Sequence, residues 1–231
     1  LILVTVLIFI VAVYAQSMKV EIPLSFGRVR GQGIRWPLKF MYTSNIPVIL
    51  VAALFANIQL WARLLESWGR PLLGTFSGNT PTSGVITWLF APNLPAEIIG
   101  GSFRSILLLK ALIYILAFVI GSIIFSVFWV QTAGMDASSQ AKQIIKSGLQ
   151  IPGFRRDPRV IEKVLERYIS PLTVMGAVLV GFLAATADLL GALTSGTGLL
   201  LAVMIIYKLY EDISKQHMAD MYPGLKKMMG Q

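Results

Sequence analysis

The residues with the most specific chemistry are arginines within short turn-forming sequences. They are Arg28 and Arg30 in 27–31 (GRVRG), and Arg155 and Arg156 in 152–156 (PGFRR). Gly and Pro favour a bent backbone, and a guanidinium group binds phosphate or carboxylate oxygens in pairs. Arginines on two loops could together bind phosphates, with an affinity that falls as salt rises. The alternative, basic charge that only orients the chain and contacts anionic lipid, stays open at this point.

The residues that catalysis or metal binding would need are scarce. The sequence has no cysteine and one histidine, His217, which excludes Cys-ligated and histidine-rich metal sites. It contains no H-E-x-x-H motif and no phosphate-binding loop. The segment 74–78 (GTFSG) does not match the G-x-S-x-G pattern of serine hydrolases. We therefore expect neither an enzyme nor a cofactor.

Three polar residues interrupt apolar runs. Asp188 lies near the end of its run, so contact with water is the favoured explanation, although an acid at membrane depth is also a functional candidate. Asn57 and Gln59 lie in the middle of another run, where a side-chain amide needs a partner, worth on the order of 1 kcal/mol. They predict either plain contacts between helices or a polar latch on a surface that opens. The sequence favours neither.

The composition identifies the elements that must position these residues. Of 231 residues, 55% are apolar and 13% are charged, against about 25% charged residues in a soluble domain. The apolar residues gather in long runs, so we predict an all-α integral membrane protein with five transmembrane helices. The predicted spans are 1–15, 46–65, 105–130, 169–193 and 199–210, with loops at 16–45, 66–104 and 131–168 and a polar tail at 211–231.

The first run has fewer than the roughly 20 residues of a complete span. We interpret it as a span cut at its start rather than as a signal peptide, because no basic segment precedes it. The chain is then expected to be a fragment of a longer protein. The last two spans are joined by 191–198 (GALTSGTG), which predicts a tight hairpin between antiparallel neighbours.

The distribution of charge predicts the orientation in the membrane. The net charge is +9, and Lys and Arg number five in 16–45, seven in 131–168 and four in the tail from Lys208, but two in 66–104. Basic loops stay on the cytosolic side. We therefore expect the two long basic loops and the C-terminus in the cytosol, and 66–104 outside as a mostly irregular loop.

Several motifs along the chain are similar to those of one family. They are 16–24 (QSMKVEIPL), 42–50 (YTSNIPVIL), 54–60 (LFANIQL), 152–156 (PGFRR), 168–175 (YISPLTVM) and 196–201 (GTGLLL). In sequence and in order they resemble the SecY family of protein-conducting channels, in its archaeal and eukaryotic branch. That family has ten spans in two pseudo-symmetric halves around a pore. The resemblance implies that this chain is the C-terminal half, spans six to ten.

The resemblance also implies roles for single residues in the membrane. Ile49 and Leu201 match positions of a ring of aliphatic side chains that closes around a passing polypeptide and blocks ions when idle. The second and third spans match one wall of a lateral gate. Asn57 and Gln59 lie on that wall, and Asn57 fits the polar latch that faces the other half.

The resemblance further implies partners. The basic loops match the cytosolic loops that dock the ribosome, which assigns contacts with ribosomal RNA to Arg28, Arg30, Arg155 and Arg156. Other implied partners are the N-terminal half (spans one to five), SecE-type and small beta-type subunits, signal peptides, nascent chains and membrane lipids. The implied location is the cell membrane, or the endoplasmic reticulum membrane in a eukaryote.

A second function from another class remains as an alternative. Half of a secondary transporter built from repeats would also place polar residues near the middle of the membrane. In that case Asp188 and Asn57 would line a substrate site.

Overall fold

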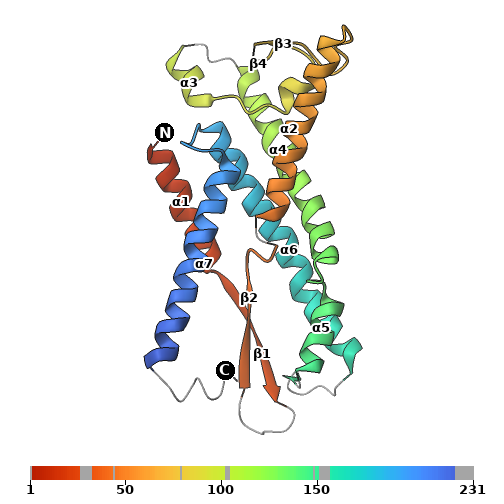
Figure 1. Ribbon diagram of the computed structural model, residues 1–231, viewed down its shortest axis with the longest axis vertical. Helices are drawn as coiled ribbons and strands as arrows, with labels where there is room; N and C mark the ends of the chain where they lie inside the picture. The colour runs from red at the N-terminus through yellow and green to blue at the C-terminus, as the bar shows by residue number, and fades with distance from the viewer. Residues whose placement is uncertain are drawn as a thin grey trace.

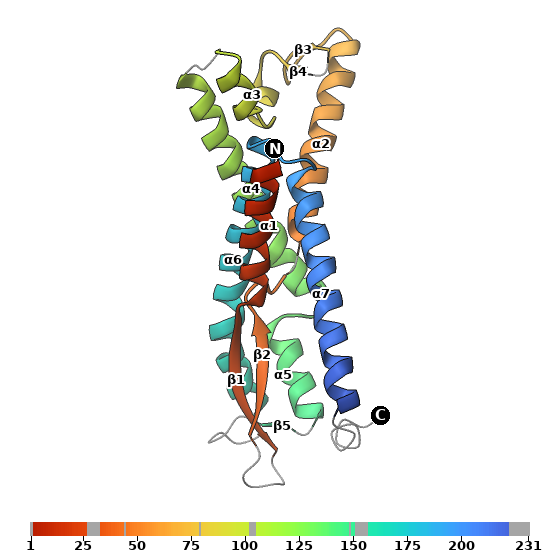
Figure 2. The same cartoon turned by 90° about the vertical axis from the view of Figure 1, so that its left-hand side faces the viewer.

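The computed structural model describes residues 2–26, 33–43, 45–78, 80–101, 105–147, 149–150 and 157–221. Its helices are α1 (Ile2–Ser17), α2 (Ile46–Ser67), α3 (Leu94–Ile99), α4 (Ser105–Thr132), α5 (Ala137–Lys146), α6 (Pro158–Leu189) and α7 (Gly196–Met221), with a 3-10 helix η1 (Val85–Trp88). Its strands are β1 (Lys19–Phe26), β2 (Gly33–Lys39), β3 (Phe76–Ser77), β4 (Thr80–Pro81) and β5 (Leu149–Gln150). The long helices lie along one axis, and the smaller elements gather at its two ends (Figures 1 and 2).

Three helices in the described part of the chain, α2, α4 and α6, are long and apolar enough to cross a membrane. Helices α2 and α4 begin where the sequence predicted, at Ile46 and Ser105. Helix α1 is apolar but has 16 residues, and α7 has 26 residues, with a polar second half. Length and composition therefore identify three candidate spans, and the total of five spans remains a prediction.

Helix α6 begins well before the predicted span 169–193 and ends at Leu189. Its start is explained by Asp157, whose side chain accepts a hydrogen bond from the backbone N–H of Arg159 at 3.0 Å, and by Pro158 in the first turn. At 32 residues the helix is about 48 Å long, which exceeds the roughly 30 Å of a bilayer core. Its charged first turns therefore extend beyond the apolar region.

A small sheet lies beside those first turns, which the prediction of an all-α chain did not include. Strand β1 pairs antiparallel with β2 along its length, and it also pairs with β5, so the order is β2-β1-β5. The sheet and the neighbouring helices share one hydrophobic cluster. Its buried members are Ile22, Leu38, Tyr42, Val130, Ala141, Ile144, Ile161, Leu165, Ile169 and Leu172. The hairpin of β1 and β2 is therefore packed against α5 and α6 (Figure 1).

Small residues allow α4 and α6 to pack closely within the apolar region. A Cβ atom added at Gly181 of α6 would lie 2.8 Å from Ser122 Oγ of α4. One turn of α4 further on, Ser126 Oγ lies 2.9 Å from Thr43 Oγ1 and 3.3 Å from the carbonyl oxygen of Thr173. Small and hydroxyl-bearing residues are the usual means by which helices associate without water. These contacts hold α4, α6 and the segment that precedes α2 together.

The opposite end of the molecule carries β3, β4, η1 and α3 between irregular segments, as expected for most of 66–104 (Figure 1). The carboxylate of Glu66, near the end of α2, accepts hydrogen bonds from the backbone N–H of Phe76 at 3.0 and 3.2 Å. The guanidinium of Arg63 lies 5.1 Å from the centre of the Phe76 ring. The loop is thus attached to the helix that precedes it.

Candidate functional site

The two residues predicted for the pore ring both lie on open helix faces. Helix α2 buries Val51 and Phe55 and leaves Ile49 37% exposed. Helix α7 buries Leu200 and leaves Leu201 42% exposed. A large apolar side chain that faces away from the rest of the chain needs lipid or another protein segment beside it. The structure therefore leaves both residues available to line a surface shared with a partner.

Asn57 and Gln59 lie on different sides of α2, because residues two apart are separated by about 200° around a helix. Asn57 is exposed, and its amide donates a hydrogen bond to the carbonyl of Ala53 in the same helix at 2.8 Å. Gln59 is half-buried, and its amide lies 3.5 Å from the carbonyl oxygen of Leu89, just after η1. The structure does not bring the two amides together. Only Asn57 shares the open side of α2 with Ile49.

Asp188 joins three helices at the end of the molecule opposite the hairpin. Its Oδ1 accepts a hydrogen bond from the backbone N–H of Gly196, at the start of α7, at 2.6 Å. Its Oδ2 accepts one from the hydroxyl of Tyr114, in α4, at 3.1 Å. The sequence favoured contact with water for Asp188 and did not identify either partner. Tyr114 is 74 residues away along the chain, so no local pattern could have indicated it.

A cavity of about 230 Å³ lies beside this carboxylate. Its lining includes Gln59, Tyr114, Asp188, Ser195 and Thr197, but not Asn57. This cavity therefore does not bring Asp188 and Asn57 together as the transporter alternative would require. Both carboxylate oxygens of Asp188 are already engaged by the protein itself.

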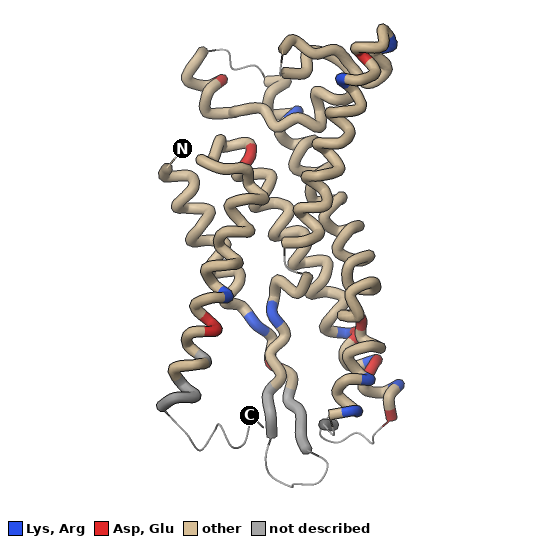
Figure 3. The backbone as a smooth tube through the Cα atoms, viewed as in Figure 1, with Lys and Arg blue, Asp and Glu red and all other residues tan. Residues whose placement is uncertain are grey.

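Basic residues gather at the hairpin end of the molecule, with few at the other end (Figure 3). The four arginines predicted to dock the ribosome, Arg28, Arg30, Arg155 and Arg156, lie outside the described residues. The strands that adjoin their two segments are paired, since Phe26 of β1 lies opposite Leu149 of β5. The chain thus enters both basic segments from neighbouring positions.

The hairpin is also tied to α7. Lys39 Nζ, at the end of β2, lies 2.6 Å from Glu211 Oε2 of α7. The same ammonium group lies 6.0 Å from the centre of the Tyr207 ring. An ion pair with this exposure contributes at most about 1 kcal/mol, so it orients the two elements more than it stabilises them.

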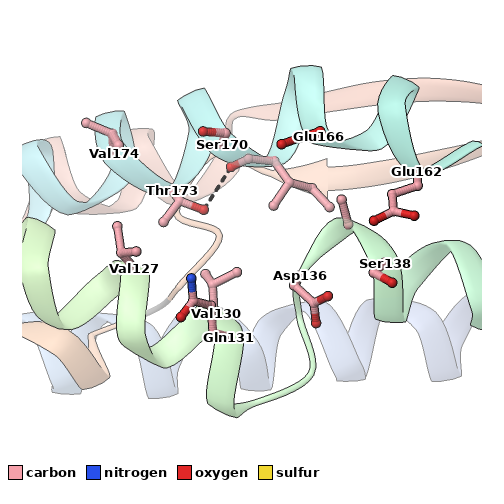
Figure 4. A pocket seen from close by; sticks show the side chains of 12 residues that line it. Val127, Val130, Gln131, Asp136, Ser138, Glu162, Glu166, Ser170, Thr173 and Val174 are labelled. Atoms are coloured by element: carbon pink, nitrogen blue, oxygen red, sulfur yellow. Dashed lines mark hydrogen bonds between the residues drawn. The ribbon is translucent and has the colours of Figure 1, made fainter. Parts of the chain in front are cut away.

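A second cavity, of about 290 Å³, opens between α4, α5 and α6 near the hairpin end (Figure 4). The carboxylates of Asp136, Glu162 and Glu166 line it together with the apolar side chains of Val127 and Val130. Among the described residues no group of three His, Cys, Asp or Glu side chains is placed to hold a metal ion. The cavity is thus acidic at one side and apolar at the other, without the geometry of a metal centre.

Asp136 caps α5 at the edge of this cavity. Its carboxylate accepts a hydrogen bond from the backbone N–H of Ser139 at 3.2 Å, and hydrogen bonds from Ser139 lower the pKa of the Asp136 carboxyl. The hydroxyl of Tyr42 donates to the carbonyl of Met135 at 2.6 Å. Burial, with a smaller effect of the negative charge of Asp136, raises the pKa of Tyr42 to about 12. These contacts support the connection from α4 to α5.

Comparison with known proteins identifies this arrangement. Residues 1–210 match the model of the SecY family. The chain belongs to the SecY family. The motifs that resembled SecY in the sequence are therefore confirmed as signs of its family.

Curated SecY relatives match almost the whole chain. Protein translocase subunit SecY of Methanococcus vannielii is 47% identical over 229 residues, which are 99% of this chain and 51% of the relative. The SecY subunit of Pyrococcus furiosus is 46% identical over 98% of this chain and 47% of its own length. The chain spans about half the length of these relatives.

Solved SecY structures have the same fold. One match is a SecY structure from work on the plug domain, which stabilises the closed state of that translocation channel. Its TM-score is 0.77 and its identity is 43%, over 96% of this chain and 50% of that one. A protein-conducting channel matches with a TM-score of 0.76 and 43% identity over the same shares. The idle yeast Ssh1 complex on the 80S ribosome matches at 20% identity with a TM-score of 0.68, over 91% of this chain and 44% of that one, and shows the fold alone.

Proposed function

We propose that this chain is the C-terminal half of the central subunit of a protein-conducting channel. In this role it passes unfolded secretory polypeptides across the membrane and releases apolar segments sideways into lipid. The observation that carries the proposal is the match of nearly the whole chain to one half of SecY channel structures at 43% identity. The channel itself needs the other half, because this chain covers 50% of the channel structures that it matches.

The pore ring is the first part of the proposal. Ile49 and Leu201 are large, aliphatic and exposed, and they lie on α2 and α7. Aliphatic side chains around a narrow pore exclude water and ions when they meet. Their exposure supports a place on the pore surface, where side chains from spans one to five would complete the ring.

The lateral gate is the second part. Asn57 lies on the open side of α2, and among the described residues its amide donates a hydrogen bond only within its own helix, to the carbonyl of Ala53. That geometry suits a latch in which Asn57 forms a hydrogen bond with a polar partner on the other half, and this bond breaks when the gate opens. Gln59 instead faces the loop beyond η1, so we place it behind the gate, where it supports the external loop.

Docking of the ribosome is the third part. Arg28, Arg30, Arg155 and Arg156 are the proposed contacts with ribosomal RNA. The pairing of β1 with both β2 and β5 supports their joint action, because it joins the two basic segments through one small sheet. Packing of that sheet against α5 and α6 would give the docking surface a rigid base.

The remaining proposals concern the membrane and the assembly. The end of the molecule that carries the hairpin, α5 and most basic residues (Figure 3) is proposed to face the cytosol, with α1 and α7 completing five spans. The partners are spans one to five, a SecE-type subunit, a small beta-type subunit, and the signal peptides and nascent chains that pass through. Membrane lipids would cover the apolar faces that these partners leave free.

Cross-linking tests the proposal directly. The chain has no cysteine, so a single cysteine at Ile49 or Leu201 provides one reactive thiol. In the channel assembled with spans one to five, we expect I49C and L201C to form disulfides with a cysteine in a stalled secretory chain. Val178 of α6 is 39% exposed, which matches Ile49, and V178C is the control that should not react. Equal reaction at all three positions, or none at the first two, would contradict the proposal.

A further inference from the structure

We infer that Asp188 is a positioning residue for the pore ring: its carboxylate sets the place of α7, and thus of Leu201, relative to α2 and α4. This inference rests on the proposed function, because it concerns the ring of that channel. The observation behind it is that each carboxylate oxygen accepts one hydrogen bond from a different helix, from Gly196 N–H at 2.6 Å and from Tyr114 O–H at 3.1 Å. Hydrogen bonds to a carboxylate are stronger than those between neutral groups.

We call the two hydrogen bonds of Asp188, to Gly196 and Tyr114, the clamp. The bond to Gly196 holds the start of α7. A Cβ atom at Gly196 would collide with the carbonyl of Ala184, so the first residue of α7 lies directly against α6. Leu201 follows Gly196 by five residues, which is about 7.5 Å along the helix. Because a helix is rigid over that distance, displacement of Gly196 moves Leu201 with it.

The bond to Tyr114 connects Asp188 with α2 through aromatic packing. The ring of Tyr114 packs edge-on against Phe55 with centroids 6.0 Å apart, and Phe118 completes a group of three aromatic rings, 5.5 Å from Phe55. Phe55 lies on the same helix as Ile49, six residues further on, which is about 9 Å along the axis. Asp188 therefore connects the helices that carry both predicted ring residues.

Side-chain packing is incomplete beside the clamp. The cavity of about 230 Å³ borders Asp188, Tyr114, Ser195 and Thr197, the last two at the start of α7. A void of this size removes the contacts that would otherwise hold a helix end in place. The two hydrogen bonds of Asp188 thus add a directional restraint to the packing of this end of α7 against α6.

The experiment measures ion leak through the idle channel, assembled with spans one to five, in planar bilayers. In D188N the side chain keeps its shape, but one carboxylate oxygen becomes an NH₂ group that cannot accept a hydrogen bond. We expect the resting leak to rise about tenfold, the factor that corresponds to loss of one hydrogen bond to a charged group. Y114F removes the other bond and should raise the leak in the same direction.

Two further variants separate positioning from general destabilisation. Within the described part of the chain the hydroxyl of Thr186 bonds only to carbonyls of its own helix, Phe182 at 2.8 Å and Leu183 at 3.0 Å, so T186V should leave the leak unchanged. The double variant D188N/Y114F should leak less than the product of the two single effects predicts, because both residues act in one contact. Thermal unfolding of each variant shows whether a change in leak follows loss of folded protein.

These measurements distinguish failure of the inference about Asp188 from failure of the proposed function. Replacement of Ile49 and Leu201 by Gly tests the ring itself and should raise the leak. If these ring variants leak and D188N and Y114F do not, the inference about Asp188 is wrong, but the proposed channel function is not contradicted. If D188N leaks only in proportion to its loss of thermal stability, the role is structural and the inference is likewise wrong. If the ring variants do not leak, the ring assignment within the proposed function fails.

Discussion

At the scale of the residue, buried hydroxyl groups determine how the helices meet. Ser126 is fully buried, and its single hydroxyl proton is offered to Thr43 Oγ1 at 2.9 Å or to the carbonyl of Thr173 at 3.3 Å. Thr173 donates its own hydroxyl to the carbonyl of Ile169 at 2.8 Å. A buried polar group without a partner costs about 1–3 kcal/mol. The hydroxyl of Ser126 therefore finds its partners on other segments, whereas the hydroxyl of Thr173 bonds within α6.

The first prediction concerns Ser126. In S126A the hydroxyl oxygen of Thr43 loses the hydrogen bond that Ser126 donates to it, so we expect the free energy of unfolding to fall by about 1 kcal/mol. The matched control is S67A, because the hydroxyl of Ser67 is exposed and, as far as the structure describes the chain, bonds only to the carbonyl of Leu64 in its own helix at 2.8 Å. Thermal unfolding in detergent, followed by tryptophan fluorescence, compares them. Equal shifts in the two variants would show that burial of the hydroxyl does not matter.

At the scale of the element, the close approach of α4 and α6 depends on residues with little or no side chain. Gly181 faces Ser122 Oγ and also the Cα atom of Val119, which would lie 3.3 Å from an added Cβ. Gly121 of α4 faces Val51 of α2 in a similar way, at 3.0 Å. Glycine costs about 1 kcal/mol in a helix interior relative to alanine. The presence of glycine at these positions indicates that close packing between the helices stabilises the fold by more than the lost helix propensity costs.

The second prediction follows from that competition. Helix propensity alone would make G181A more stable, whereas the contact with Ser122 predicts a loss of about 1–3 kcal/mol from overpacking. The exchanged pair G181A/S122G moves the side chain to the other helix and should recover part of the loss. Unfolding free energies of the two single variants and the double variant measure the coupling. A stabilised G181A, or strictly additive effects, would show that the helices adjust freely.

At the scale of the whole molecule, charge and apolar surface are separated. The apolar faces of the long helices form the middle, and the hairpin, α5 and the first turns of α6 form a basic end (Figure 3). The length of α6, at 32 residues, joins the two regions in one rigid element.

The third prediction concerns that basic end. In the assembled channel, R155E/R156E should lower the affinity for ribosomes by about tenfold or more, because positioned guanidinium groups lose bonds to phosphates. The control is K142E/K146E, which changes charge equally on two exposed lysines of α5 at the same end. Cosedimentation with ribosomes at several salt concentrations gives the affinity and its salt dependence. Equal losses for both pairs would mean that bulk charge, and not the arginine positions, binds the ribosome.

Local properties of the sequence determined the class of this protein and the placement of its clearest helices. The apolar runs that begin at Ile46 and Ser105 coincide with the starts of α2 and α4, because hydropathy is a sum over neighbouring residues and needs no knowledge of the fold. The family followed from motifs in their order along the chain. The early start of α6 had a local signal, Asp157 followed by Pro158, but the surrounding charges favoured a loop.

Only the tertiary structure decided which residues meet. It placed the amide of Gln59 beside the carbonyl of Leu89, and it joined Asp188 to Tyr114 and Gly196. It also paired β1 with β5, more than a hundred residues later. The physical reason is that a hydrogen-bond partner is defined by position in space, and segments far apart in the sequence reach that position only when the helices pack.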